Sequence, residues 1–234
     1  AKYYIYIENQ YFISSIDSAS PKNRILDALY QRIKKAITYQ TKFRVMIVLP
    51  VYPGGSITSV PVRYMAKYTY RSINRGGDSL LEKLAKDFPG VDLSEYVQFF
   101  TPRQKDLDAD GLPITEAIYV HAKMMIVDDC HVIIGSANIN DRSMRGTRDA
   151  EIAILTEQFT DMEQSYMDGE LVSVSKFAHD LRLRQWCDLL NCGPDTIIDP
   201  ISDEVWGGLL SIAHSNTELY LSIVASLPDN TYVS

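Results

Sequence analysis

Five polar residues in one short stretch of the chain have the types and spacing that phosphate chemistry requires. The stretch is YVHAKMMIVDDCHVIIGSAN, at residues 119–138. His121 and Lys123 are two residues apart, so on an extended strand their side chains point to the same side. A lysine ammonium neutralises phosphate oxygens, and a histidine, which titrates near neutral pH, attacks phosphorus or transfers a proton. The pair therefore predicts phosphoryl transfer.

Ser136 and Asn138 repeat this spacing a little further along the chain. Their hydroxyl and amide groups can donate hydrogen bonds to the same phosphate oxygens and stabilise the charge of a trigonal-bipyramidal transition state. A lone histidine and lysine on a strand are more often ordinary surface residues. The interpretation therefore depends on all five residues occurring together at these spacings: the His121–Lys123 pair, then Asp128, then the Ser136–Asn138 pair.

Together with Gly135, the five positions form the pattern H-x-K-x4-D-x6-G-S-x-N, which begins at His121 and ends at Asn138. This pattern resembles the signature of the phospholipase D superfamily. The segments IYIENQYF at 5–12, GTRDAE at 146–151 and DPISD at 199–203 are similar to eukaryotic phospholipases D. RSINRGGDSLLEKL and KFAHDLRLRQW resemble the animal, fungal and protist type more than the plant calcium-dependent type.

In that superfamily two copies of the signature, one in each lobe, meet at one site, and the resemblance implies that this chain carries the second copy. It implies that the histidine of the other lobe attacks phosphorus. His121 is then the general acid for the leaving choline oxygen, and afterwards the base for water or an alcohol. Lys123 and Asn138 are expected to bind phosphate oxygens, with Ser136 supporting them. Glu151 matches the family's acid that hydrogen-bonds the imidazole and fixes its tautomer.

Three more residues belong to the expected site. Asp128 is part of the catalytic signature, but it lies several residues beyond the facing pair and is interpreted as a structure-setting carboxylate at the strand end. Glu8 and Gln10 share one face of the IENQYF strand end, which the resemblance places beside the substrate headgroup. Both are expected to line the site. The reaction is expected to need no metal and no cofactor.

One acidic segment imitates the first half of a calcium-binding loop, DLDADG at 106–111. The position that requires a bidentate glutamate is Ala117, and Pro113 stands where the loop should pair as a strand. We interpret the segment as an acidic loop that leads into the catalytic strand, with calcium binding as the minor alternative.

Composition limits the partners of the chain. The formal charge is −7, from 23 Lys plus Arg against 30 Asp plus Glu, which is opposite to the basic surface that nucleic-acid binding requires. We therefore expect a phospholipid substrate at a membrane surface and no nucleic acid.

The three cysteines lack CxxC spacing, which argues against a disulfide framework or a zinc cage. The longest apolar stretch, around 45–52, is too short to span a bilayer, so we expect a cytoplasmic protein with peripheral membrane contact.

Apolar periodicity predicts an α/β fold, with a mixed, largely parallel sheet flanked by helices. Residues 3–7 and 43–49 are typical of buried central strands, and between them Ile25, Leu29, Ile33 and Ile37 form one helix stripe. The chain is thus expected to begin with a β-α-β unit. Further along, the pattern predicts helices at 62–74 and 79–88, a strand at 96–100, a loop, strands within 117–128, 131–135 and 150–155, and helices in the last third, one of them at 205–213.

Basic residues and histidines outside the signature are given ordinary structural roles. Four arginines of the predicted helices are interpreted as solvated, with contact to anionic lipid as the minor alternative: Arg71, Arg75, Arg182 and Arg184. Three histidines are not expected to bind metal: His131, His179 and His214.

The whole chain, 1–234, is expected to form one lobe, the C-terminal half of a two-lobe phospholipase D whose N-terminal lobe lies outside it. Such an enzyme would convert phosphatidylcholine into phosphatidate and choline, or transfer the phosphatidyl group to an alcohol, through a phosphohistidine. Two alternatives stay open. One is a superfamily nuclease or phosphatidyltransferase. The other is a half-site that is inactive unless it dimerises, because the chain holds no second H-x-K.

Overall fold

The structure is a computed structural model, and it describes residues 1–17, 20–52, 54, 58–157 and 160–221. The elements of its first half are β1 (Tyr4–Asn9), α1 (Ile25–Thr38), β2 (Arg44–Val48), α2 (Val60–Ile73), α3 (Leu80–Asp87), the short 3-10 helix η1 (Leu93–Glu95), β3 (Val97–Phe100), β4 (Arg103–Leu107) and β5 (Pro113–Ala117). The second half contains β6 (Lys123–Val127), β7 (His131–Gly135), α4 (Asp141–Met144), β8 (Ala153–Glu157), β9 (Met162–Met167), β10 (Glu170–Ser175), α5 (Lys176–Leu190), the 3-10 helix η2 (Pro194–Ile197) and α6 (Asp203–Leu221).

Six strands form the central sheet, in the order β3-β2-β1-β6-β7-β8. The pairs β1–β2 and β2–β3 are parallel, as the predicted β-α-β unit requires, and the pairs β1–β6, β6–β7 and β7–β8 are antiparallel. Consequently β1, β2, β3 and β7 run in one direction, and β6 and β8 run in the other. The prediction of a mixed, largely parallel sheet flanked by helices is confirmed.

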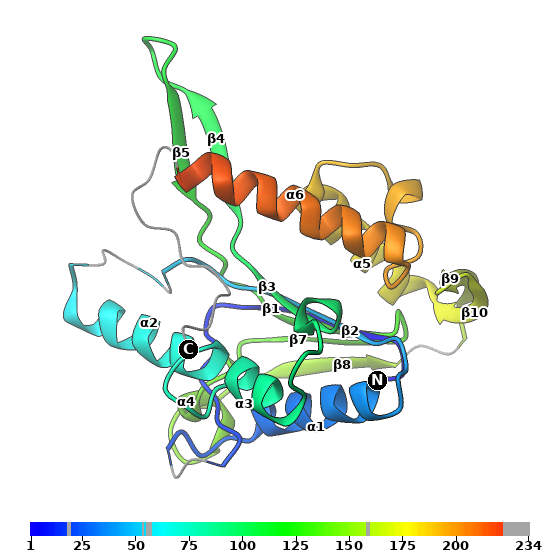
Figure 1. Cartoon of the computed structure of the whole chain (residues 1–234), viewed down its shortest axis with the longest axis horizontal. Coiled ribbons are helices and arrows are strands. Elements are labelled where there is room, and N and C mark those ends of the chain that lie inside the picture. Colours follow the sequence, from blue (N-terminus) through cyan, green and yellow to red (C-terminus); the bar gives the residue numbers. More distant parts are fainter. Residues whose placement is uncertain (18–19, 53, 55–57, 158–159, 222–234) are drawn as a thin grey trace.

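Helices cover both faces of this sheet (Figure 1), with α1, α2 and α3 on one side and α5 and α6 on the other. The alternation of apolar side chains along β1 explains why both faces are covered. Ile5 and Ile7 point into the core beneath α1 and α3, whereas Tyr4 and Tyr6 point into the core beneath α5 and α6. A strand that is apolar on both faces can only lie at the centre of a three-layer fold.

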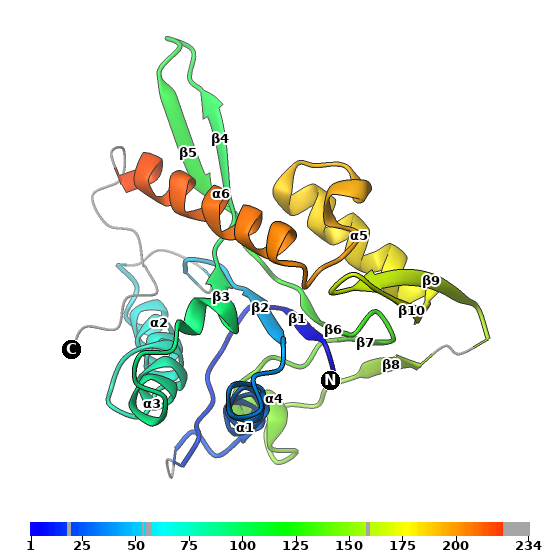
Figure 2. The same cartoon turned by 45° about the vertical axis from the view of Figure 1, so that its right-hand side comes forward.

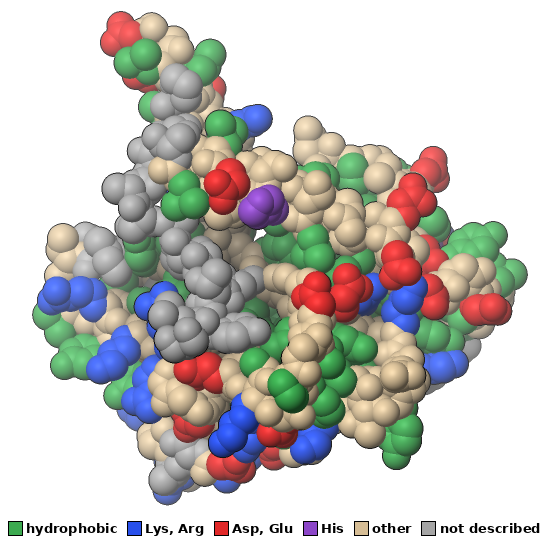
Figure 3. All heavy atoms as spheres, in the orientation of Figure 1, with side chains coloured by type: hydrophobic (Ala, Val, Ile, Leu, Met, Phe, Trp, Pro, Cys, Tyr) green, Lys and Arg blue, Asp and Glu red, His purple; other side chains and the backbone are tan. Residues whose placement is uncertain are grey.

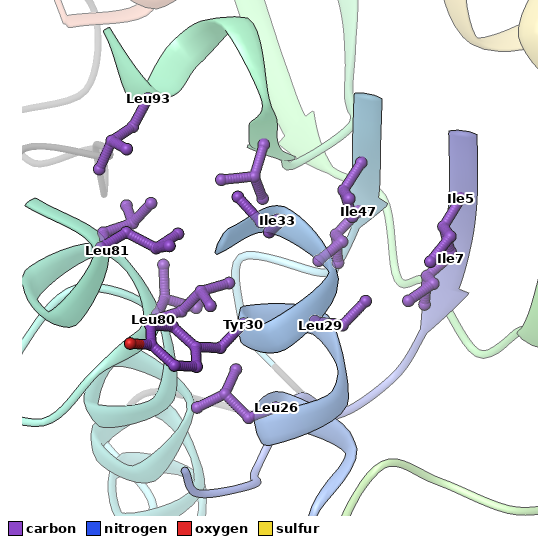
Figure 4. Packing of buried hydrophobic residues seen from close by; sticks show 14 of the residues in the cluster. Ile5, Ile7, Leu26, Leu29, Tyr30, Ile33, Ile47, Leu80, Leu81 and Leu93 are labelled. Carbon is purple, nitrogen blue, oxygen red and sulfur yellow. The ribbon is translucent and has the colours of Figure 1, made fainter. Parts of the chain in front are cut away.

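The first core is built on the helix stripe that the sequence predicts. Leu29, Ile33 and Ile37 of α1 are buried, whereas Ile25, at the first position of the helix, is only partly buried. Figure 4 shows how the side chains of α1 converge with those of β1, β2, α3 and η1; the labelled ones are Ile5, Ile7, Leu26, Leu29, Tyr30, Ile33, Ile47, Leu80, Leu81 and Leu93.

The second core depends on large aromatic side chains. Trp186 of α5 is fully buried and packs edge-on against Tyr4 and Tyr6, with ring centroids 6.3 and 5.8 Å apart. Edge-to-face packing at such distances is favourable because the positive ring edge meets the negative ring face. Trp206 of α6 is equally buried, and its indole N–H donates to the carbonyl oxygen of Ser94.

The boundaries of α3 follow directly from its sequence. The hydroxyl of Ser79 accepts from the backbone N–H of Glu82, and the Glu82 carboxylate accepts from the backbone N–H of Ser79, which forms a capping box. Beyond the helix, Gly90 adopts a left-handed conformation with φ of 85°. The helix predicted at 79–88 is confirmed at Leu80–Asp87.

Two β-hairpins were not predicted. The segment expected to be a loop after residue 100 contains the antiparallel pair β4–β5, which projects away from the body of the molecule in both views (Figures 1 and 2). The last third, expected to be helical, begins with the antiparallel pair β9–β10. Four of the five residues of β4 are exposed, so this strand lacks the apolar alternation that would identify it, and the buried residues of β9 include the polar Ser165 as well as Met167.

The calcium-like segment lies at the tip of the β4–β5 hairpin. Asp108 Oδ1 accepts hydrogen bonds from the backbone N–H groups of Asp110 and Leu112, at 3.0 and 2.8 Å. Its carboxylate thus closes the turn, as aspartate commonly does. In the part of the chain that the structure describes, His, Cys, Asp and Glu side chains do not gather in any group able to hold a metal ion.

One prediction about the arginines was wrong. Arg182 is not solvated: its side chain and that of Asp129 are both 0% exposed, with Nη2 and Oδ2 2.7 Å apart. The remaining three, Arg71, Arg75 and Arg184, are exposed. Of the described helices, none is both long and apolar enough to cross a membrane.

Candidate active site

The site residues meet at one edge of the sheet. β1 pairs with β6 so that Asn9 lies opposite Lys123, and β7 pairs with β8 so that Gly135 lies opposite Ala153. Since neighbouring strands of this part run in opposite directions, the end of β1 meets the beginning of β6, and the end of β7 meets the beginning of β8. The residues gathered at this edge are Glu8, Gln10, His121, Lys123, Ser136, Asn138 and Glu151.

The signature pair begins the strand rather than lying within it. Lys123 is the first residue of β6, and His121 precedes the strand, so the prediction that both residues lie on it was wrong for His121. The Lys123 ammonium donates to the backbone carbonyl oxygen of His121, at 2.6 Å, and to Gln10 Oε1, at 3.1 Å. The lysine head therefore lies against the backbone of the histidine.

Gln10 links the lysine to an aromatic residue. Its Nε2 donates to the hydroxyl of Tyr119 at 2.7 Å, while its Oε1 accepts from Lys123. The ring of Tyr119 stacks on the imidazole of His121, with centroids 5.6 Å apart and an interplanar angle of 28°. Tyr119 was not predicted as a site residue, although it stands two positions before the histidine on the same expected strand.

Glu151 has different partners from the predicted one. Its carboxylate accepts from the hydroxyls of Ser136 and Ser143, each at 2.5 Å. Among the described residues, the imidazole of His121 makes no hydrogen bond. The two serine donors, together with the positive charge of Lys123, lower the pKa of Glu151. Ser143 is a second residue that the sequence analysis did not identify.

Burial shifts two further pKa values in this region. Burial lowers the pKa of Lys123, and the negative charge of Glu151 opposes this effect. Burial also raises the pKa of Glu8, against the hydrogen bond that its carboxylate accepts from the hydroxyl of Tyr6. Glu8 lies opposite Met124, next to the Asn9–Lys123 pair. The site thus combines the partly buried ammonium of Lys123 and carboxylate of Glu8 with the exposed carboxylate of Glu151.

Gly135 allows the chain at Ser136 to lie close to the beginning of β8. A Cβ atom at Gly135 would lie 2.4 Å from the carbonyl oxygen of Ile152, so no larger residue fits here without moving the strand. This approach allows the backbone N–H of Ser136 to donate to Ile152 at 2.9 Å. Asn138 Oδ1 is buried and accepts no hydrogen bond from the residues that the structure describes.

The loop after the signature is fixed by its own polar side chains. Arg142 makes a bidentate ion pair with Asp149, through Nε to Oδ2 at 2.9 Å and Nη2 to Oδ1 at 3.1 Å. Asn140 caps α4, because its Oδ1 accepts from the backbone N–H of Ser143. These contacts hold Ser143 beside Glu151. They connect the segment GSANINDRS, at 135–143, with GTRDAE, at 146–151.

Comparison with known proteins identifies the family. A family profile described as "Phospholipase D" matches residues 114–231, and one described as "Cardiolipin synthase, PLD-like domain" matches residues 1–169. The chain belongs to the phospholipase D superfamily. Phospholipase D B of Dictyostelium discoideum is 41% identical over 95% of the chain, which spans 18% of that protein. Phospholipase D zeta 1 of Arabidopsis thaliana is 41% identical over 98% of the chain, which spans 22% of that protein.

These eukaryotic relatives confirm the resemblance that the signature and its flanking segments indicated. The chain spans about a fifth of the length of the relatives it matches. Among solved structures, Nuc from Salmonella typhimurium, a phospholipase D family member, is 18% identical, with a TM-score of 0.36. That comparison covers 82% of this chain and 80% of the other.

The aspartate of the phospholipase D signature lies away from the other signature residues. Asp128 follows the last residue of β6, at the opposite end from Lys123, and adopts a φ of 54°. Its Oδ1 accepts from the backbone N–H groups of Tyr3 and Tyr4, at 2.7 and 2.8 Å, and its Oδ2 accepts from that of Lys2 at 2.5 Å. These contacts tie the start of β1 to the turn after β6.

Proposed function

We propose that this chain is the C-terminal lobe of a two-lobe phospholipase D and supplies one half of its active site. The substrate is phosphatidylcholine at a membrane surface, and the products are phosphatidate and choline. The observation that carries the proposal is the contact of the Lys123 ammonium with the His121 backbone at the sheet edge where Ser136, Asn138 and Glu151 also lie. The names of the relatives supply the substrate class.

In the proposed mechanism, a histidine nitrogen of the other lobe attacks phosphorus. As the bond from phosphorus to the choline oxygen breaks, His121 gives its proton to that oxygen. Water or an alcohol then attacks the phosphohistidine, His121 takes the proton of the attacking hydroxyl, and the phosphorus–nitrogen bond breaks. The chain's residues hold the proton at the imidazole and require no metal or cofactor.

Lys123 supports this reaction through charge. Its ammonium is partly buried, and an ammonium in such surroundings interacts more strongly with a phosphate oxygen than one in bulk water does. Among the described residues, its two hydrogen-bond acceptors are neutral, a carbonyl and an amide oxygen. The positive charge therefore remains available to the phosphate. Asn138 and Ser136, at the adjoining end of β7, would donate to the remaining oxygens.

Choline release tests the proposal in the whole enzyme, meaning the polypeptide in which the other lobe accompanies this chain. Removing the proton donor or the ammonium should each lower turnover by about 10³-fold or more, so His121→Ala and Lys123→Ala are expected to be inactive. His131→Ala is the matched control, since His131 begins β7 at the other edge of the sheet and pairs with Glu157. Near-normal choline release from His121→Ala would refute the proposal.

Choline release, compared with DNA binding and DNA cleavage, distinguishes a phospholipase D from the nuclease alternative. On the face shown in Figure 3, positive and negative side chains are interspersed, and the whole chain carries a net charge of −7. Neither observation favours binding to a polyanionic backbone. A phospholipase D is expected to release choline and to show no salt-dependent DNA binding. Cleavage of DNA without choline release would favour the nuclease alternative.

A separate experiment tests the proposal that the chain is one lobe of a two-lobe enzyme. One copy of the signature supplies one histidine, so the isolated 234-residue chain is expected to be inactive as a monomer. Sedimentation combined with choline release distinguishes an inactive monomer from an active symmetric dimer. Sedimentation with phosphatidylcholine vesicles tests the proposed peripheral location, at the cytoplasmic face of a membrane.

A further inference from the structure

The general acid of the proposed reaction is not oriented by the residue that the signature suggests. Both carboxylate oxygens of Glu151 accept from serine hydroxyls, and the imidazole of His121 makes no hydrogen bond within the described part of the chain. His121 is also exposed and lies outside the regular strand. An imidazole in these surroundings has rotational freedom that a proton donor must lose before it can act.

Within the described residues, the imidazole stacks on one aromatic ring, that of Tyr119, at a centroid distance of 5.6 Å. The orientation of Tyr119 is itself fixed at its far end. Gln10 Nε2 donates to the phenol oxygen at 2.7 Å, and Gln10 is buried at the end of β1. The ring therefore has an anchor in the sheet.

The same amide group also contacts the second signature side chain. Gln10 Oε1 accepts from the Lys123 ammonium at 3.1 Å. A continuous path thus runs from the ammonium through one amide to the phenol, and from the phenol ring to the imidazole. Because an amide is rigid and planar, its two ends set the separation of the groups that they hold.

We propose that Tyr119 is a positioning residue that, held by Gln10, sets the orientation of His121 relative to Lys123. This inference rests on the proposed function of His121 as the proton donor. It assigns Gln10 to the support of the half-site rather than to direct contact with the headgroup. A displacement of about 1 Å at a reacting group can reduce a rate by about 10²-fold, so loss of the stacked ring should be visible in turnover.

Two substitutions at Tyr119 separate the ring from its hydroxyl. In the whole enzyme, Tyr119→Leu removes both and is expected to lower kcat about 50-fold, with KM within about twofold of the wild-type value. Tyr119→Phe keeps the stacked ring and loses only the anchor, so about a fivefold loss of kcat is expected. Tyr39→Leu is the matched control, because Tyr39 is 69% exposed and lies at the end of α1.

A second measurement detects the contact between the Tyr119 ring and the His121 imidazole, and it does not depend on activity. With ¹³C at the Cε1 position of the histidines, the His121 signal is identified by its loss in His121→Asn. The stacked phenol ring shifts this signal, and Tyr119→Leu should remove the shift whereas Tyr119→Phe should keep it. Tyr119→Leu is not expected to unfold the protein, since Tyr119 is 52% exposed.

The two readouts keep this inference distinguishable from the proposed function. A wild-type enzyme without choline release would overturn the proposed function, and the His121 signal would still report whether Tyr119 orients the ring. An unchanged His121 signal in Tyr119→Leu would overturn the inference whatever the activity. Turnover in Tyr119→Leu equal to that of Tyr39→Leu would overturn it as well.

Discussion

The two ends of β6 carry polar residues with opposite roles. At the beginning of the strand, Lys123 donates to two neutral acceptors among the described residues, and the imidazole of His121 is exposed. At the other end, Asp128 accepts from three backbone N–H groups, and Asp129 is buried in an ion pair with Arg182. The strand is only five residues long, so the two arrangements lie about 17 Å apart.

The two ends of β6 differ in whether their polar groups are available to a substrate. A polar group whose hydrogen bonds are all made inside the protein stabilises the fold and is not available to a substrate. A polar group that keeps free donors is available, and contributes little to stability. The signature residues at the beginning of β6 are therefore expected to affect turnover, whereas the aspartates at its end are expected to affect unfolding.

The largest effect on stability is expected at the buried ion pair. Arg182 donates to both oxygens of Asp129 and to the carbonyl oxygens of Ile197 and Ile198. Arg182→Met fills similar space but leaves a buried carboxylate unpaired, which should reduce the free energy of unfolding by about 3–5 kcal/mol. Urea denaturation measures this loss. The exposed Arg184 gives the control, since Arg184→Met should change stability by less than about 0.5 kcal/mol.

A smaller effect is expected at the junction of β7 and β8. Gly135→Ala would place a Cβ atom 2.4 Å from the Ile152 carbonyl oxygen, so the strands must separate beside Ser136 and Glu151. We expect a loss of about 2 kcal/mol in unfolding free energy and a fall in kcat. Gly193→Ala is the matched control, because no atom lies within 4 Å of a Cβ at that position. Equal stability and turnover of the two variants would contradict this explanation.

Asp128→Asn tests whether the signature aspartate acts through the fold. Asparagine tolerates the left-handed conformation found here, with φ of 54°, so the backbone is expected to be kept. The change replaces one acceptor oxygen by an N–H donor that faces backbone donors, at a cost of about 1–2 kcal/mol. At a temperature where the variant is folded, kcat should stay within about threefold of the wild-type value. A loss of turnover with unchanged urea midpoint would show a direct catalytic role instead.

The smallest effect is a dependence of stability on pH. Serine donors hold the pKa of Glu151 below the ordinary glutamate value in the folded protein. A depressed folded pKa gives stability that is present above the ordinary value of about 4.3 and is lost as pH falls through the lower folded value. The urea midpoints of wild type and Glu151→Gln should therefore differ by a constant amount above about pH 5.5, and this difference should shrink towards pH 3. A difference that does not change with pH would exclude the effect.

Much of the fold could be predicted because its signals are local. The stripe of α1, the capping box at Ser79 and the doubly buried strands β1 and β2 each depend on residues close together in the sequence. The hairpins β4–β5 and β9–β10 have no such signal, because each is defined by the pairing of its own two strands and neither belongs to the central sheet. Their positions depend on tertiary contacts that periodicity does not encode.

The site was predictable in position but not in its contacts. Adjacent short strands were expected to carry the signature, and the structure brings their ends together at one edge of the sheet. The contact between Glu151 and the serines could not be predicted, because Ser136 follows β7 whereas Ser143 lies on the short helix α4, and the Arg142–Asp149 pair that fixes this region forms only in the folded chain. Likewise, an arginine on a helix is usually solvated, and nothing local reveals that Arg182 faces a buried aspartate.

Paired measurements on Lys123→Met and Arg182→Met test most directly whether the beginning of β6 serves the reaction and its end serves stability. Each variant is assayed for choline release in the whole enzyme and for its urea midpoint. We predict that Lys123→Met loses at least about 10³-fold in turnover while its midpoint stays at the wild-type value, and that Arg182→Met loses stability. A Lys123→Met protein that unfolds as early as Arg182→Met, or that releases choline at the wild-type rate, would contradict the account.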